Sequence, residues 1–97
     1  LNARTLARVI GVSEATLSRM KTGDHVLEAG TKPHELALLV VRVFRSLDAI
    51  TGGDDAVSRS WLAGHNLALR GKPVELITSV TGLVDVVSYL DANRAIV

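Results

Sequence analysis

The side chains best suited to chemistry lie near the start of the chain, where basic and hydroxyl residues surround a tight turn. Ala7, Gly11 and Leu17 have the spacing of a helix-turn-helix, in which a small residue and a flexible turn let two helices meet. In such a motif the N-terminal end of the second helix enters the major groove of DNA. The pattern therefore predicts DNA binding by this pair of helices.

The residues expected to contact DNA lie on the outward face of the second helix or carry positive charge beside it. Arg19 can bind guanine through a bidentate contact, and Thr16 and Ser18 can reach a phosphate or a base edge. Three further basic residues suit phosphate contacts. The predicted set is Arg4, Arg8, Ser13, Glu14, Thr16, Ser18, Arg19 and Lys21. The alternative is a plain helical hairpin without DNA-binding activity, because many helical domains contain the same spacing.

Other candidates for chemistry have structural explanations that fit better. Asp54 and Asp55 could form a carboxylate pair, but a helix N-cap accounts for them because the helix dipole favours acidic residues there. His25, His34 and His65 lack the i, i+4 spacing of a metal site, and the chain contains no Cys. No phosphate-binding loop or catalytic triad pattern is present. We therefore expect no enzyme activity, no metal and no cofactor.

Composition limits the class of protein further. The 97 residues carry a net charge of +1, and 47% of them are hydrophobic, which is enough for the core of one small domain. Only 3% are aromatic, too few for a base-stacking platform. The apolar runs fall far short of the ~20 residues of a membrane span, and no signal peptide opens the chain. We expect a cytoplasmic protein without a membrane partner, whose natural chain begins upstream because no Met stands first.

The elements that position these residues are predicted to be helices, because no segment alternates apolar and polar side chains. The expected fold is all-α, with a helix-turn-helix over residues 1–24 that lacks its usual supporting first helix. A second helical domain is expected over residues 25–97. Six helices are expected, over residues 5–10, 13–21, 32–50, 54–63, 73–80 and 83–93. The pair Thr81-Gly82 is expected to separate the last two.

The predicted long helix over residues 32–50 carries apolar side chains on more than one face. Phe44 is expected in the core, whereas Leu38 and Val41 widen the apolar face beyond a single stripe. Such a helix lies either at the centre of a bundle or in a dimer seam, so we expect a homodimer. Trp61 is expected to anchor the core by packing against this helix.

An ordered series of residues follows the helix-turn-helix: Trp61-Leu62, Asn66-Leu67-Ala68-Leu69-Arg70-Gly71-Lys72-Pro73, Glu75-Leu76-Ile77, Thr81-Gly82, Val86 and Tyr89-Leu90-Asp91. This series resembles the toxin-binding domain of the Xre/MbcA/ParS antitoxin family. The helix-turn-helix also resembles the N-terminal part of that family, so the resemblance covers nearly the whole chain. Two features depart from it: the missing first helix, and an end without the glycine that the family often has there.

The resemblance implies an antitoxin that blocks a RES-domain toxin, which consumes NAD, or a related ADP-ribosyltransferase toxin. It also implies repression of the antitoxin's own operon through operator DNA, and a larger toxin–antitoxin complex. The apolar chain end either folds back onto the core or enters the cleft of the toxin. The expected toxin contacts are Arg70, Lys72, Tyr89, Asp91, Arg94, Ile96 and Val97. The alternative for Arg70 and Lys72 is a solvated loop without a partner. The rival hypothesis is a stand-alone dimeric helix-turn-helix regulator without a toxin.

Overall fold

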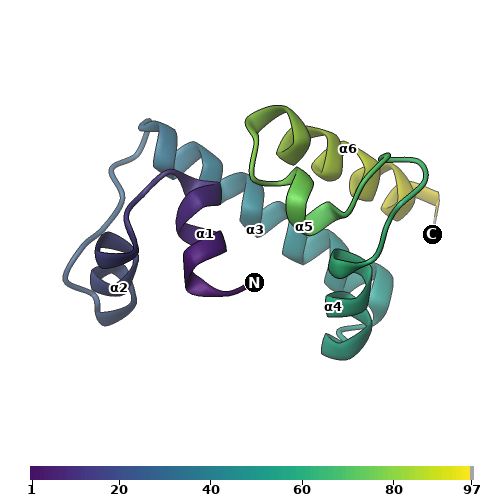
Figure 1. The fold of residues 1–97 in the computed structure, drawn as a ribbon, viewed down its shortest axis with the longest axis horizontal. Coiled ribbons are helices and arrows are strands. Elements are labelled where there is room, and N and C mark those ends of the chain that lie inside the picture. The colour runs from purple at the N-terminus through teal and green to yellow at the C-terminus, as the bar shows by residue number, and fades with distance from the viewer. Residues whose placement is uncertain (97) are drawn as a thin grey trace. The chain divides into compact units, whose positions relative to one another are not determined.

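The computed structural model describes residues 1–96, with side chains through Arg94, and every regular element in that part of the chain is a helix (Figure 1). The all-α prediction is therefore confirmed. No helix within the described residues is long and apolar enough to cross a membrane. The helices are α1 (Ala3–Ile10), α2 (Glu14–Thr22), α3 (Lys32–Thr51), α4 (Asp55–Ala63), α5 (Pro73–Leu76) and α6 (Val80–Ile96).

The helices form two compact units that divide within α3. The first unit, Leu1–Leu38, contains α1, α2, the connector and the first turns of α3. The second unit, Leu39–Val97, contains the rest of α3 and the three later helices. The predicted domains, residues 1–24 and 25–97, were defined as parts that fold independently. The division into compact units does not measure independent folding, so this domain boundary stays a prediction.

Side-chain caps explain where three of the helices begin. Asn2, Ser13 and Asp54 each accept a hydrogen bond from the backbone N–H three residues ahead, at 2.8, 3.0 and 3.1 Å. Each bond satisfies a donor that the first turn of a helix leaves free. The predicted cap at the pair Asp54 and Asp55 is confirmed, and Asp54 is the capping residue. The cap at Asn2 starts α1 two residues earlier than the predicted start at residue 5.

The core of the second unit is built from α3, α4, α5 and α6. Phe44, predicted to be in this core, is only half-buried, because its neighbour Val43 occupies the inward position and each residue turns the helix by about 100°. Leu38 and Val41, expected to be covered on a second side, are 53% and 45% exposed in the single chain. The buried apolar residues here are Val40, Val43, Leu47, Leu62, Ile77, Leu83, Val86, Val87 and Leu90.

The predicted helix break at Thr81-Gly82 is wrong. Helix α6 begins at Val80 and continues through both residues, while the Ser79 hydroxyl accepts a hydrogen bond from the Gly82 N–H at 3.0 Å. A Cβ atom on Gly82 would lie 2.0 Å from the backbone carbonyl oxygen of Leu76. The glycine therefore marks a close approach of the end of α5 to the first turn of α6, not the end of a helix.

We expect Gly82→Ala to destabilise the protein, although alanine inside a helix is normally favoured over glycine by about 1 kcal/mol. The added methyl would force the backbone at Leu76 to move, so the free energy of unfolding should fall by about 1–3 kcal/mol. Urea unfolding measures this change. Ser88→Ala, at an exposed position of the same helix, is the control and should stay within about 0.5 kcal/mol of the parent chain. Equal stability of the two variants would contradict the close contact.

Candidate functional site

The turn between α1 and α2 has the geometry that the helix-turn-helix pattern predicts. Gly11 ends α1 in the left-handed region, with φ 76° and ψ 34°. The N–H groups of Gly11 and Val12 both donate to the carbonyl oxygen of Ala7, at 2.9 and 3.0 Å. Ala7 and Leu17 are 2% and 4% exposed, so the small residue and the apolar residue of the pattern are both buried. The two helices therefore meet as the spacing requires.

The eight residues predicted to contact DNA lie at the surface of the first unit. Thr16 is half-buried and the other seven are exposed. Arg4 and Glu14 lie on opposite sides of the turn, and their Nε and Oε2 atoms are 3.9 Å apart. An exposed pair of this kind contributes little to stability. The Glu14 carboxylate does reduce the positive charge that a phosphate would meet at Arg4.

A short chain of hydroxyl groups positions Arg19 on the outward face of α2. Arg19 Nη2 donates to Thr16 Oγ1 at 3.1 Å, and the Ser13 hydroxyl donates to the same oxygen at 2.9 Å. Ser13 is itself held by the backbone N–H of Thr16. A guanidinium has five N–H donors, so Arg19 keeps several for a base or a phosphate. The arrangement is suitable for reading a base edge from the first turns of α2.

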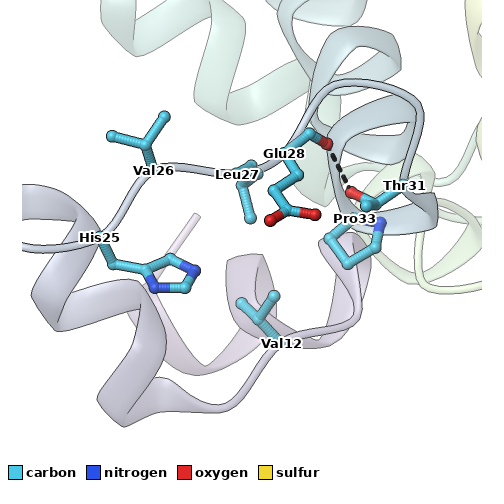
Figure 2. Close-up of a pocket in the computed structure, with 7 residues that line it drawn as sticks. All are labelled: Val12, His25, Val26, Leu27, Glu28, Thr31 and Pro33. Atoms are coloured by element: carbon cyan, nitrogen blue, oxygen red, sulfur yellow. Dashed lines mark hydrogen bonds between the residues drawn. The ribbon is translucent and has the colours of Figure 1, made fainter.

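A pocket in the first unit lies between the turn after α1 and the connector before α3 (Figure 2). It has a volume of about 370 Å³ and is open to solvent. The Thr31 hydroxyl donates to the Glu28 carbonyl at 2.7 Å and closes a turn in the connector that lines one side of the pocket. Neither this pocket nor any other part of the described chain has a group of three His, Asp or Glu side chains placed to hold a metal ion. The lining residues are Val12, His25, Val26, Leu27, Glu28, Thr31 and Pro33.

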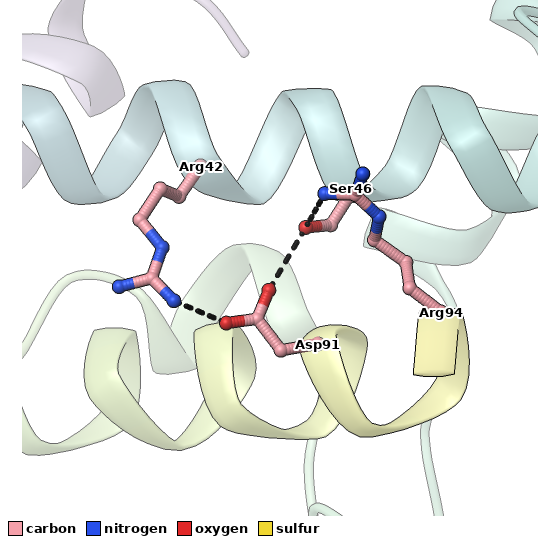
Figure 3. Close-up of polar contacts among 4 residues, drawn as sticks. All are labelled: Arg42, Ser46, Asp91 and Arg94. Atoms are coloured by element: carbon pink, nitrogen blue, oxygen red, sulfur yellow. Dashed lines mark hydrogen bonds and ion pairs between the residues drawn. The ribbon is translucent and has the colours of Figure 1, made fainter. Parts of the chain in front are cut away.

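In the second unit, a polar cluster joins the end of α6 to α3 (Figure 3). Asp91 forms an ion pair with Arg42 through one carboxylate oxygen and accepts a hydrogen bond from the Ser46 hydroxyl at the other, at 3.1 Å. Arg94 Nη1 donates to the same hydroxyl at 3.2 Å. Ser46 is 1% exposed, and its hydroxyl is satisfied both as donor and as acceptor. Asp91 and Arg94, predicted as toxin contacts, thus hold the end of α6 in place.

An aromatic pair joins α4 to α6. The rings of Trp61 and Tyr89 have centroids 6.2 Å apart and planes inclined by 20°, the geometry of an offset stack. Both residues are half-buried. Leu62, the neighbour with which Trp61 was expected to pack, is buried at 4% exposure. The packing of Trp61 against the long helix α3 stays a prediction.

The remaining predicted toxin contacts lie at the loop before α5 and at the chain end. Arg70 and Lys72 are exposed. Val97 and the side chain of Ile96 lie outside the described residues. Leu67, which the sequence pattern does not distinguish from Leu69, is 87% exposed on the same loop. Hydrophobicity alone cannot tell which leucine of a turn faces solvent.

Comparison with known proteins identifies the second unit. Residues 46–95 match the family model described as the antitoxin Xre/MbcA/ParS C-terminal toxin-binding domain. The match covers slightly more than half of the chain and includes Ser46, the aromatic pair, the loop before α5 and Arg94. No curated protein matches the chain. The predicted family resemblance is thereby confirmed for the C-terminal half.

We expect Asp91→Ala to lower the free energy of unfolding by about 1–3 kcal/mol, because it removes the acceptor of a buried hydroxyl and the partner of Arg42. Asp85→Ala is the matched control, since it removes an exposed carboxylate from the same helix. It should change stability by about 0.5 kcal/mol or less. Guanidinium unfolding of the two variants measures the difference. If both lose the same stability, the cluster in Figure 3 does not hold α6 to α3.

Proposed function

Because the chain belongs to the Xre/MbcA/ParS antitoxin family and carries its toxin-binding domain, we propose that it neutralises an NAD-consuming RES-type toxin. The match over residues 46–95 is the observation that carries this proposal. A toxin-binding domain acts by binding, so the chain is not an enzyme, as its sequence predicts. The partner is the cognate toxin of this antitoxin. That this toxin is of the RES type is our inference from the family.

Neutralisation is proposed to occur by blocking the active site of the toxin with the segment from Arg94 onward. A pocket that binds NAD must hold phosphates and a nicotinamide, so it contains charged and polar groups. Arg94 is exposed, and its guanidinium keeps donors beyond the one bonded to Ser46, so it is a suitable competitor for those groups. The polar cluster on Ser46 supports this arrangement, because it fixes α6 as far as Arg94 and limits the ordering cost of binding.

The first unit is proposed to bind the operator of its own operon. The buried Ala7, the left-handed Gly11 and the exposed Arg19 favour a helix-turn-helix that places the start of α2 in the major groove. Two copies would read inverted half-sites about one helical turn apart, so the DNA-binding species is proposed to be a homodimer. Larger assemblies would then contain toxin, antitoxin dimer and operator.

We expect Arg19→Ala to weaken operator binding by about 1–3 kcal/mol, because it removes a base contact. Thr16→Ala should have a smaller effect in the same direction, since Thr16 positions the guanidinium. Footprinting on the promoter upstream of the gene, at fixed salt, measures the affinity. Arg45→Ala is the control, because it removes the same charge from an exposed position outside the first unit. Unchanged protection by the Arg19→Ala, Thr16→Ala double variant would refute the assignment of α2.

We expect removal of residues 95–97 to reduce toxin inhibition at least tenfold, while folding and DNA binding are retained. This truncation preserves Arg94 and its hydrogen bond to Ser46. NAD consumption by the neighbouring toxin, titrated with each antitoxin form, gives the inhibition. Ala92→Ser, at an exposed position on the same helix, is the control. Full inhibition by the truncated chain would mean that neutralisation uses another surface.

A further inference from the structure

A closed turn, Asn66–Gly71, connects α4 to α5, and we call it the leucine turn. Asn66 and Gly71 exchange two backbone hydrogen bonds, at 2.8 and 3.2 Å, and the Asn66 side chain accepts a third from the Leu69 N–H at 3.0 Å. A Cβ on Gly71 would lie 3.2 Å from the side chain of Leu76, so the base of the turn packs closely on α5. The turn is thus a rigid element and not a free loop.

The two leucines inside this turn have opposite environments. Leu69 is half-buried, whereas Leu67 is 87% exposed. A rigid turn that presents a leucine to solvent has already lost most of the backbone freedom that binding would otherwise remove. Insertion of Leu67 into an apolar pocket would therefore gain hydrophobic free energy at a low ordering cost.

Arg70 occupies a backbone conformation that favours glycine. Its φ is 62°, and it is the one residue other than glycine with a positive φ in the described part of the chain. Arginine at such a position costs free energy that glycine would not. The long cation at this place is therefore unfavourable for the isolated fold, which favours a use in a contact outside it.

The charged residues of the segment that contains the leucine turn, residues 56–74, are all basic. Between Asp55 and Glu75 the sequence contains no acidic residue, but it contains Arg59, Arg70 and Lys72. Arg59 pairs with Asp55 at 2.9 Å, whereas the ion pairs found among the described side chains include neither Arg70 nor Lys72. A partner that complements this surface has an apolar pocket with an acidic rim.

We propose that the leucine turn docks on the toxin, with Leu67 in an apolar pocket and Arg70 and Lys72 against acidic side chains at its rim. The inference rests on the proposed function, because the occupant is the cognate toxin and the turn lies within the matched toxin-binding range. A second copy of the chain fits less well. A symmetric dimer formed through this turn would bring the cations of both copies together.

The test measures binding of the full chain to the toxin encoded by the neighbouring reading frame, by calorimetry at two salt concentrations. Leu67→Ser should weaken binding at least tenfold, as expected for an anchor in a pocket. Arg70→Gly should weaken it severalfold and reduce its salt dependence, without lowering the melting temperature, because glycine relieves the backbone strain. This second variant separates loss of binding from loss of folding.

Val57→Ser is the matched control, because Val57 is an apolar residue of the same unit that is 49% exposed on α4. It should bind like the parent chain. If the parent chain binds the toxin and both Leu67→Ser and Arg70→Gly bind equally tightly, the docking role of the turn is overturned while the antitoxin function stands. If the parent chain fails to bind the toxin, the proposed antitoxin function is wrong, and so is the toxin as the partner that docks on the leucine turn.

Discussion

The buried hydroxyl of Ser46 is the constraint on which the C-terminal half depends. A buried hydroxyl without partners costs about 1–3 kcal/mol, and here α6 brings both an acceptor and a donor to this point of α3. Asp91 and Arg94 supply them from neighbouring turns of α6. The cluster therefore fixes the position of α6 along the axis of α3. Val43, Leu47 and Leu90 are each buried, at 1% exposure, but apolar burial is not directional and would tolerate a shift that the hydrogen bonds do not.

The connection through α5 imposes a second constraint on the same helix. Helix α5 has only four residues, and its end approaches the backbone of Gly82 so closely that no side chain fits between them. Ser79 and Gly82 are joined by a hydrogen bond at this corner. Together with the Trp61–Tyr89 stack, these contacts hold α4, α5 and α6 as one body. A domain held together in this way loses little conformational entropy when it binds a partner.

Much of the fold could be predicted because its signals are local. Capping side chains and the positive-φ glycines at Gly11 and Gly23 act within a few residues of the turns that they form, so the first two helices and α4 begin or end close to where the spacing indicates. The wrong prediction at Gly82, that the glycine separates two helices, also comes from using only local signals. A glycine that ends a helix and one that permits a close approach look alike in sequence, and the atom that decides between them belongs to Leu76 in another helix.

The sequence by itself determined the fold class, the family and the residue types of both candidate surfaces, because periodicity, caps and an ordered motif series are all written along the chain. Only the tertiary structure decided what several of those residues do. Asp91 and Arg94 are charged residues near a chain end, and nothing local distinguishes an exposed contact from a bond to α3, 45 or more positions away. Likewise, Leu67 and Leu69 have the same hydrophobicity, and only the closure of the turn places one inward and the other in solvent. Side-chain roles of this kind depend on which distant atoms arrive beside them, and that information exists only after the helices have packed.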